Sequence, residues 1–395
     1  MLCEHPVCHH GGMSDVIYLI APAGHPNFGD EFIVSAWLRD IAYRRPRARV
    51  ILDCHSPGVA AVLHHNMHPD LTVTDTLWRL VNECETAADV ATAVADPTRS
   101  PRLITGLNLA KSADVVHVLG GGWVTDLWPQ HIRVIAAAAS IGREGARRVA
   151  TGQGLHPGYA IAGELEHWWS LFDTVTVRDT PSLEFAPAQA GQDDSWLAAA
   201  DPLAANGLGH GPEDARLRGT VVAAQSDLLG IPVEELAQRI VRQLREWSTT
   251  GDDLAFIECI PGGDWLVWDA MCRLDPELME GARFVAFDEL WAHGLPARAG
   301  QTWISTRFHP HLIAAARGAR GIAVSAHDGD YYEVKHSSVG SGWPVTTLEE
   351  PTRPGEGVAD ATGRREAATA LAEEIYPAGP RERLKRDLKR ALRRG

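Results

Sequence analysis

Short apolar runs typical of β-strands alternate with helix-length segments through both halves of the chain. This alternation predicts βαβ units, in which parallel strands form a sheet covered by helices. The first half supplies the expected strands Val16–Ile20, Arg49–Leu52, Val115–Leu119, Arg148–Thr151 and Thr174–Val177. The second half supplies Val221–Ala224, Ala255–Cys259, Arg283–Phe287, Trp303–Ser305 and Ile322–Ser325. We therefore expect an α/β protein with two parallel sheets.

The length of 395 residues suits two domains. From composition we expect a tail at 1–13, a Rossmann-like domain at 14–200, an Ala-, Gly- and Pro-rich linker at 201–218, a second Rossmann-like domain at 219–349 and a tail at 350–395. Two such domains would face each other across a cleft, and small-molecule sites form preferentially at domain interfaces.

Charge and hydropathy exclude other classes of protein. The formal net charge is −14, which argues against a nucleic-acid binder held by a basic surface. No apolar run approaches the ~20 residues that span a bilayer, and the first residues lack the order of a signal peptide. We expect a cytoplasmic protein.

Both ends of the chain carry local signals. The first ten residues hold two cysteines and three histidines in a pattern that resembles a metal cluster, but a short His-rich tail is usually disordered, and we predict no metal site. Residues 381–394 contain eight basic and two acidic residues, with a leucine at every fourth position. They predict a basic amphipathic helix, which could contact an anionic membrane at its inner face, dock on the acidic body of the protein or stay solvated.

Polar residues gather in the loops that follow the expected strands, where ligands bind in open α/β sheets. The first loop contains Asn27, Gly29 and Asp30 and leads directly into a helix. Backbone N–H groups at such a turn can hold an anion, whereas Asp30 would cap the helix or bind a sugar hydroxyl. The loop lacks the GxGxxG order, so no nicotinamide cofactor is predicted.

Two further loops are rich in glycine. One contains Gly121 and Gly122 and leads towards Asp126, and the other contains Gln153 and His156. Glycines let a ligand approach the backbone, although a tight strand-to-helix crossing needs small residues too. A single histidine such as His156 is more often structural.

Thirteen tryptophans include Trp123 and Trp128 beside the first of these glycine loops. Indole rings stack well on sugar faces. Core packing is the more frequent role of such residues.

The strand-to-helix junction near residue 307 has the densest chemistry. It brings together Ser305, Arg307, His309 and His311, an unusual set for a structural turn, and we favour a functional role. Downstream, Lys335 is the only lysine expected in the second domain.

Arg178 follows a strand of the first half. Its guanidinium could bind a carboxylate or phosphate, or pair with Asp179.

The order of these motifs resembles the polysaccharide pyruvyl transferase family. The resemblance covers about residues 16 to 340 and rests on Asn27-Phe28-Gly29-Asp30-Glu31, Gly120-Gly121-Gly122, Gly152-Gln153-Gly154 with Pro157, Val177-Arg178-Asp179 with Ser182, Asp193-Asp194, Asp201-Pro202, and Ser305-x-Arg307-x-His309 with Tyr332 and Lys335.

The resemblance implies a fold similar to GT-B glycosyltransferases and the transfer of pyruvate from phosphoenolpyruvate onto two hydroxyls of a sugar, as a cyclic ketal. It implies no metal or organic cofactor. The acceptor would be a sugar, an oligosaccharide or a glycolipid of the cell envelope, and a membrane-bound acceptor would suit a basic C-terminal helix.

By the same resemblance, Arg178 and Arg307 would hold the carboxylate and phosphate of the donor, and His309 would be the main acid–base group. This chain has Phe308 where the family often has an aliphatic residue, and the nearby His311 is a rival for the acid–base role. The remaining residues expected to bind donor or acceptor are Asn27, Gly29, Asp30, Gly121, Gly122, Asp126, Gln153, His156, Ser305, His311 and Lys335.

Two alternatives remain open. The same fold could belong to a nucleotide-sugar glycosyltransferase, although the motif order follows the pyruvyl group and a clear nucleotide-base signature is absent. It could also belong to a non-catalytic glycan-binding relative, although Arg178, Arg307 and His309 are all present.

Overall fold

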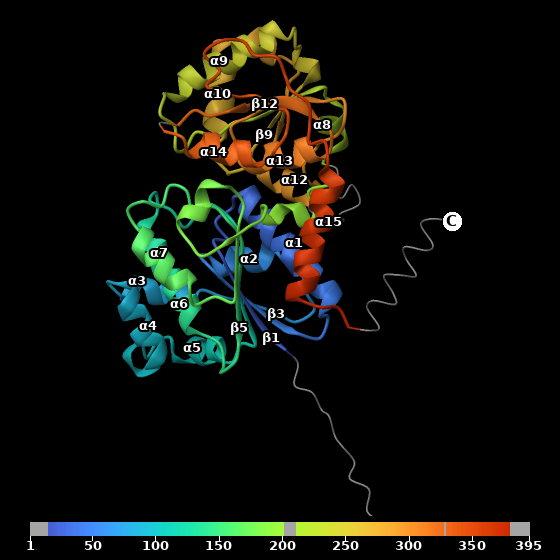
Figure 1. Cartoon of the computed structure of the whole chain (residues 1–395). Coiled ribbons are helices and arrows are strands. Elements are labelled where there is room, and N and C mark those ends of the chain that lie inside the picture. Colours follow the sequence, from blue (N-terminus) through green and yellow to red (C-terminus); the bar gives the residue numbers. More distant parts are fainter. Residues whose placement is uncertain (1–14, 201–210, 328, 380–395) are drawn as a thin grey trace, which may run out of the picture.

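The computed structural model describes residues 15–200, 211–327 and 329–379, which form two α/β domains stacked on each other (Figure 1). The first domain has a seven-stranded sheet of order β3-β2-β1-β4-β5-β6-β7, and the second a six-stranded sheet of order β10-β9-β8-β11-β12-β13. All strand pairs in both sheets are parallel. The predicted class of two Rossmann-like, GT-B-like domains is therefore confirmed.

The elements of the first domain end at residue 197. Its strands are β1 (Val16–Ala21), β2 (Arg49–Cys54), β3 (Leu71–Thr74), β4 (Val115–Val118), β5 (Arg147–Gln153), β6 (Thr174–Val177) and β7 (Gln189–Ala190). Its helices are α1 (Phe28–Arg44), α2 (Pro57–Leu63), α3 (Thr76–Glu83), α4 (Ala87–Ala95), α5 (Ile104–Lys111), α6 (Ile132–Ser140) and α7 (Ala162–Trp169), with short 3₁₀ turns η1 (Pro97–Arg99), η2 (Pro129–His131), η3 (Pro181–Glu184) and η4 (Asp194–Leu197).

The second domain repeats the plan. Its strands are β8 (Thr220–Ala223), β9 (Leu254–Ile257), β10 (Arg283–Val285), β11 (Thr302–Ser305), β12 (Arg320–Val324) and β13 (Val345–Thr346). Its helices are α8 (Glu213–Leu217), α9 (Val233–Glu246), α10 (Trp265–Leu274), α11 (Pro276–Met279), α12 (Phe287–His293), α13 (Phe308–Ala316) and α14 (Tyr331–Ser338), with the 3₁₀ turn η5 (Gly251–Asp253); α15 (Ala361–Ile375) follows.

Helices cover both faces of the first sheet because successive strand residues point to opposite sides. Ile17 and Leu19 pack with α1, while Tyr18 and Ile20 pack with the helices between α3 and α7. Because helices cover both faces, β1 is buried on both sides, and this explains why its residues form an uninterrupted apolar run.

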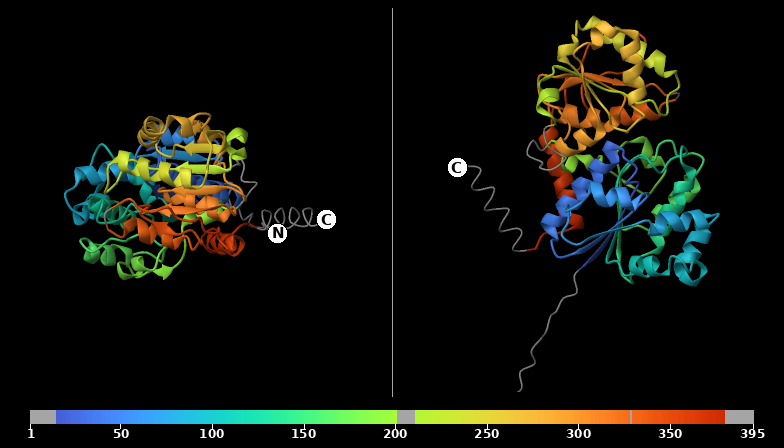
Figure 2. Two further views of the ribbon diagram at one scale, coloured as in Figure 1. Left: turned by 90° about the horizontal axis from the view of Figure 1, so that it is seen from above. Right: turned by 180° about the vertical axis from the view of Figure 1, so that it is seen from behind.

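The two domains share an apolar core. Phe28 and Phe32 of α1 belong to the same buried cluster as Phe308 and Leu312 of α13. The backbone N–H of Phe28 also donates to the carbonyl of Cys259 in the second domain, at 3.0 Å. Figure 2 shows the domains in contact from behind. Shared burial of this kind sets the relative position of the two sheets.

Helix α15 lies beside α1 of the first domain, although it follows the second domain in sequence (Figure 1). Ala372 and Ile375 pack into the first-domain cluster that contains Trp37, and Glu373 pairs with Arg44. The chain therefore crosses between the domains twice.

The ten predicted strands all occur in the structure, and β3, β7 and β13 were not predicted. The cysteine- and histidine-rich start, the first part of the predicted linker (201–210) and the predicted basic amphipathic helix at 381–394 lie outside the described residues. Among the described residues, no helix is long and apolar enough to cross a bilayer.

Candidate active site

The carboxyl ends of both sheets border one cavity of about 420 Å³ between the domains. In each sheet the strand order reverses at the strands nearest the cavity, β1 and β4 in the first and β8 and β11 in the second. Such reversal points are where open α/β sheets bind ligands. The cavity lining includes Asn27, Gly29, Asp30, Gly122 and Arg178 from the first domain and Gln225, Arg307, His309, Tyr331 and Lys335 from the second.

Arg178 directly follows β6, so its buried guanidinium lies at the carboxyl edge of the first sheet. Nη1 donates to Oδ2 of Asp193 at 3.2 Å, and Nε lies 3.7 Å from Oδ2 of Asp179. Cζ lies 4.7 Å from the centre of the Phe308 ring, which belongs to the second domain. Nε has no hydrogen-bond partner among the described residues. Arg178 therefore forms the predicted ion pairs and also faces the cavity.

The glycine loops make room for this guanidinium. A Cβ on Gly122 would lie 2.7 Å from Nη2 of Arg178, and one on Gly154 would lie 2.6 Å from Nε and Nη2. Contacts this short do not occur with real Cβ atoms, so any side chain at either position would displace Arg178. The glycines serve the cationic side chain as well as an approaching ligand.

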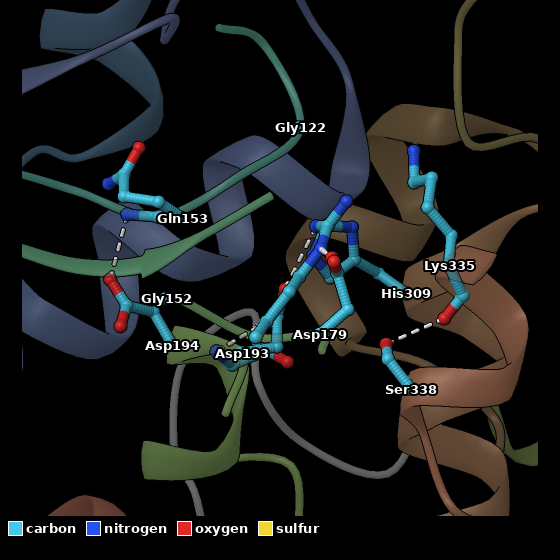
Figure 3. Close-up of polar contacts among 12 residues, drawn as sticks. Gly122, Gly152, Gln153, Asp179, Asp193, Asp194, His309, Lys335 and Ser338 are labelled. Carbon is cyan, nitrogen blue, oxygen red and sulfur yellow. Dashed lines mark hydrogen bonds and ion pairs between the residues drawn. The ribbon is translucent and has the colours of Figure 1, made fainter. Parts of the chain in front are cut away.

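His309 lies in the first turn of α13, in the second domain, and its side chain contacts residues of the first domain. Its Nε2 lies 3.4 Å from Oδ1 of Asp193 (Figure 3). The ring packs against Gly29, where a Cβ would lie only 1.9 Å from Nδ1. Burial alone would raise the pKa of Asp193, but the positive charges of His309 and Arg178 outweigh it and lower that pKa. Asp193 is thus an ionised carboxylate that both the histidine and the arginine share.

Lys335 projects from α14 into the cavity, with Nζ donating to the Tyr331 hydroxyl at 3.1 Å. Nζ also lies 4.6 Å from the centre of the Tyr331 ring and 5.1 Å from that of Tyr332. Burial and, to a smaller extent, the nearby charge of Arg178 lower the pKa of Lys335 to about 7, although the carboxylates of Asp30 and Asp193 oppose this. Its ammonium has no carboxylate within ion-pair distance among the described residues, so the charge is available to an anionic ligand.

Asp30 occupies the first turn of α1 and lines the cavity. Asn27 caps this helix, since its side-chain oxygen accepts from the Gly29 N–H at 3.2 Å, and its amide nitrogen donates to Oδ2 of Asp30 at 2.9 Å. Burial raises the pKa of Asp30 to about 6, although the charges of His309 and Lys335 oppose this. The cap expected of Asp30 is supplied by Asn27, which leaves the carboxylate facing the cavity.

Arg307 is bound on one side by carboxylates. Nε lies 3.3 Å from Oδ2 of Asp264, Nη2 bonds Oδ1 of the same residue, and Nη2 lies 2.7 Å from Oδ1 of Asp227. Burial would lower the pKa of Arg307, but these two carboxylates raise it overall. Nη1 is the guanidinium nitrogen without a described partner. The structure gives Arg307 less room to bind an anion than the sequence suggested.

Comparison with known proteins agrees with this geometry. The family model described as polysaccharide pyruvyl transferase matches residues 27–228, which is more than half of the chain. The chain belongs to the polysaccharide pyruvyl transferase family. The matched region contains Asp30 and Arg178, whereas His309 and Lys335 lie beyond it. No curated protein matches the chain.

Solved structures show distant likeness only. The UDP-GlcNAc 2-epimerase from Neisseria meningitidis bound to UDP-GlcNAc aligns over 96% of this chain and 100% of its own, with 11% identity and a TM-score of 0.45. The UDP-GlcNAc 2-epimerase from Methanocaldococcus jannaschii in complex with UDP-GlcNAc and UDP aligns over 91% and 99%, with 8% identity and a TM-score of 0.46. The E. coli ADP-heptose lps heptosyltransferase II aligns over 92% and 99%, with 12% identity and a TM-score of 0.39. At such values the likeness says nothing about chemistry.

Several residues expected to bind ligands in this pyruvyl transferase family member instead support the loops of the first domain. Gln153 is fully buried and its amide donates to the carbonyls of Val118 and Leu119 at 3.2 and 3.0 Å. Asp126 accepts from the Ala160 N–H at 3.1 Å. Neither side chain lines the cavity; the amide nitrogen of Gln153 and the carboxylate of Asp126 bind backbone groups instead.

His156 and Gly121 also differ from expectation. His156 is buried, with Nε2 2.9 Å from Oδ1 of Asp330, and so links the domains outside the cavity. Gly121 adopts φ of 139°, in the region that favours glycine, and a Cβ there would meet the Trp123 ring at 2.7 Å. Both residues shape the surroundings of the cavity.

In the second domain, Ser305 and His311 face inward. Ser305 donates to the Arg307 carbonyl at 2.6 Å. His311 is fully buried between His336, with 3.0 Å between the Nδ1 atoms, and Ser341, 2.8 Å from Nε2. His311 lies outside the cavity lining, which corrects its expected role as a rival acid–base group.

The sequence indicates no role for Asp193, Asp264 or Tyr331. Asp193 belongs to a motif that the family resemblance includes, but its partners Arg178 and His309 come from two different domains. Asp264 follows a pair of glycines and meets Arg307 only through tertiary packing. No local pattern connects such pairs.

Proposed function

We propose that this protein transfers the pyruvyl group of phosphoenolpyruvate onto two hydroxyls of a sugar and forms a cyclic ketal. The observation that carries the proposal is the convergence of Arg178, Lys335, His309 and Asp30, from two domains, on one buried cavity. Two cationic groups suit a donor that carries a carboxylate and a phosphate, and two groups that exchange protons near neutral pH suit the chemistry.

Arg178 and Lys335 are assigned to the anionic groups of the donor. Arg178 has unpartnered nitrogen in the described structure, and the ammonium of Lys335 bonds only a phenolic oxygen among the described residues. Arg307 contributes Nη1, because Asp264 and Asp227 take its other nitrogens. The low pKa of Lys335 without ligand rises when an anion binds beside it.

The reaction needs a proton at the methylene carbon of phosphoenolpyruvate. Protonation makes the central carbon cationic, the oxygen of the first sugar hydroxyl bonds to it, and that hydroxyl loses its proton. The bond from this carbon to the phosphate oxygen then breaks, phosphate leaves, and the second hydroxyl closes the ring. Of the two hydroxyl protons released, one balances the new methyl group and the other leaves with phosphate.

His309 and Asp30 divide these proton transfers. His309, oriented by the ionised Asp193, acts as the acid that protonates the methylene carbon. Asp30, whose pKa is raised to about 6 by burial, accepts the proton of a sugar hydroxyl. A base whose pKa is raised towards neutrality is efficient at physiological pH.

Calorimetry tests the donor assignment. Phosphoenolpyruvate, UDP and GDP are titrated into the wild type, Lys335→Met and the surface control Lys111→Met. Losing one charge-assisted contact predicts about 10- to 100-fold weaker phosphoenolpyruvate binding in Lys335→Met, and unchanged binding in Lys111→Met. Binding of UDP or GDP without phosphoenolpyruvate binding would overturn the proposal in favour of a nucleotide-sugar glycosyltransferase.

A further inference from the structure

The cavity has a second part that the donor chemistry does not use. It is lined by aromatic side chains from loops of the first domain, among them His55, Trp123, Trp128 and His131. We call these four residues the aromatic subsite. They follow β2 and β4 of the first domain, whereas Lys335 lies on α14 of the second domain.

The rings of the aromatic subsite form a continuous cluster around the buried Trp78. Ring centres are 4.5 Å apart for His55 and Trp78, 5.5 Å for Trp78 and Trp123, and 5.8 Å for Trp123 and His131. The rings of Trp128 and His131 are nearly parallel, at 13° and 6.4 Å. Trp128 is half-buried and ends the cluster at the cavity.

One polar group in this cluster lacks a partner. The indole Nε1 of Trp123 is buried and has no hydrogen-bond partner among the described residues, and Trp123 itself is 5% exposed. Buried donors are normally satisfied, so an orphaned donor on a cavity wall points to a ligand oxygen. A Cβ on Gly121 would lie 3.3 Å from this Nε1 and 3.8 Å from Oδ1 of Asp30. Nε1 of Trp123 and the carboxylate of Asp30, the proposed base, therefore both lie close to Gly121.

The aromatic subsite is uncharged at neutral pH. Burial lowers the pKa of His131, and burial with the nearby His25 lowers that of His55, so both rings are neutral. His131 Nδ1 donates to the Trp123 carbonyl at 2.6 Å, which leaves Nε2 as a hydrogen-bond acceptor. This part of the cavity thus offers neutral rings, with Nε1 of Trp123 as a donor and Nε2 of His131 as an acceptor. The cationic groups of the cavity, Arg178 and Lys335, belong to its other part.

The aromatic subsite is also held in place before any ligand binds. Arg133, next to it on α6, donates from Nη1 to the carbonyls of Val81 and Cys84 at 3.0 and 2.6 Å, and so fixes the loop to α3. Asp126 holds the same loop at Ala160. A preformed ring surface loses little entropy when it binds a rigid ligand.

We propose that the aromatic subsite binds the acceptor as a neutral hexopyranose ring, stacked on Trp128 and hydrogen-bonded by Nε1 of Trp123. This assignment rests on the proposed function and names its second substrate. A pyranose has one face of C–H groups that packs on an indole and a rim of hydroxyls that meets polar groups. Stacking here places the hydroxyl rim beside Asp30, the proposed base.

Saturation-transfer NMR tests the aromatic subsite without requiring turnover. The probes are methyl β-D-galactopyranoside, methyl β-D-glucopyranoside and methyl α-D-mannopyranoside, with uridine as a competitor. The variants are Trp128→Ala, Trp123→Phe, which keeps an aromatic ring and removes the N–H, and the control Trp265→Ala, whose side chain is 45% exposed outside the cavity.

We expect at least one glycoside to receive saturation in the wild type and in Trp265→Ala. Loss of one aromatic contact predicts about 2- to 13-fold weaker glycoside binding in Trp128→Ala, with phosphoenolpyruvate affinity unchanged. Loss of one hydrogen bond predicts about 2- to 13-fold weaker glycoside binding in Trp123→Phe. Thermal melting of each variant confirms that it is folded.

Other outcomes separate this proposal from the donor assignment. If no glycoside binds the wild type, or if Trp128→Ala binds as well as Trp265→Ala, the aromatic subsite proposal is wrong. Displacement of the glycoside by uridine at lower concentration would overturn it in favour of a base-binding site. If the glycoside effect holds and phosphoenolpyruvate does not bind, the aromatic subsite stands and the donor assignment fails.

Discussion

Asp193 is the residue through which the two domains share charge in the cavity, since it lies against both His309 and Arg178. Asp193→Asn keeps the side-chain oxygen that accepts from the Ser195 N–H at 3.0 Å, so the turn at η4 survives. We expect kcat to fall about 100-fold because the proton donor loses its orienting charge. Phosphoenolpyruvate affinity should stay equal or rise, because Arg178 loses a competing anion.

Steady-state kinetics and calorimetry on Asp193→Asn separate these two effects. Asp214→Asn, which alters an ion pair whose carboxylate is 54% exposed, is the matched control. An unchanged kcat, or a loss of donor binding with kcat intact, would show that Asp193 has a different role.

The lowered pKa of Lys335 predicts how the binding of phosphoenolpyruvate depends on pH. A pKa of about 7 in the free protein means that Lys335 is protonated below that pH and neutral above it. Because an anion binds the charged form, the Kd of phosphoenolpyruvate should rise above pH 7, by up to about tenfold per pH unit. In Lys335→Met the rise should vanish, and calorimetry between pH 6 and 9 measures both. Parallel curves for the two proteins would exclude Lys335 as the titrating group.

At the scale of elements, the first turn of α1 lies against the first turn of α13 from the other domain. A Cβ on Gly29 would lie 1.9 Å from Nδ1 of His309, whereas one on Gly58 in α2 would meet nothing within 4 Å. Gly29→Ala should displace His309, lower kcat at least about 100-fold and destabilise the fold by about 1–3 kcal/mol. Gly58→Ala should leave kcat unchanged. Kinetics and thermal melting compare the two, and equal kcat values would show that the ring adjusts freely.

The same scale shows what the sequence could predict. The ten strands with apolar runs were found because full burial leaves a continuous signal, as in β1. The missed strands are edge strands: β3 is half-buried throughout and β7 and β13 have two residues each. Helix α1 begins at Phe28, which is buried against the other domain and so falls outside the amphipathic pattern of its own helix.

For the candidate site, the sequence predicted the loops but not the pairings. Arg178 and His309 are indicated because they follow strands, whose carboxyl ends collect ligand-binding groups. Lys335 is indicated because it is the only lysine expected in the second domain. The neutralisation of Arg307 by Asp264 and the burial of His311 depend on how distant segments pack, which no local spacing encodes.

At the scale of the whole molecule, the C-terminal side of α15 connects to the active-site loops. Tyr376 lies 2.9 Å from Nδ1 of His117, whose Nε2 lies 2.9 Å from Oγ1 of Thr151. Thr151 donates to Asp194 at 2.7 Å, and Asp194 accepts from the N–H of Gly120 at 2.8 Å. Because Thr151 donates its proton to Asp194, its oxygen accepts from Nε2 of His117. Nδ1 of the neutral His117 ring is then an acceptor, so Tyr376 donates to it. Burial lowers the pKa of His117 to about 3, which keeps its ring neutral.

Because of this chain of hydrogen bonds, Tyr376→Phe tests how much the segment after α15 contributes to the stability of the fold. The variant keeps the ring and leaves Nδ1 of His117 buried without a donor, which costs about 1–3 kcal/mol. Urea unfolding should show this loss, while Tyr159→Phe, at a side chain that is 64% exposed, should unfold like the wild type. Equal midpoints for both variants would mean that the Tyr376 hydroxyl adds no measurable stability and that the apolar contacts with Trp37 and the ion pair of Glu373 with Arg44 hold α15. A lower midpoint for Tyr376→Phe would instead show that a segment following the second domain stabilises the sheet edge that carries the glycine loops.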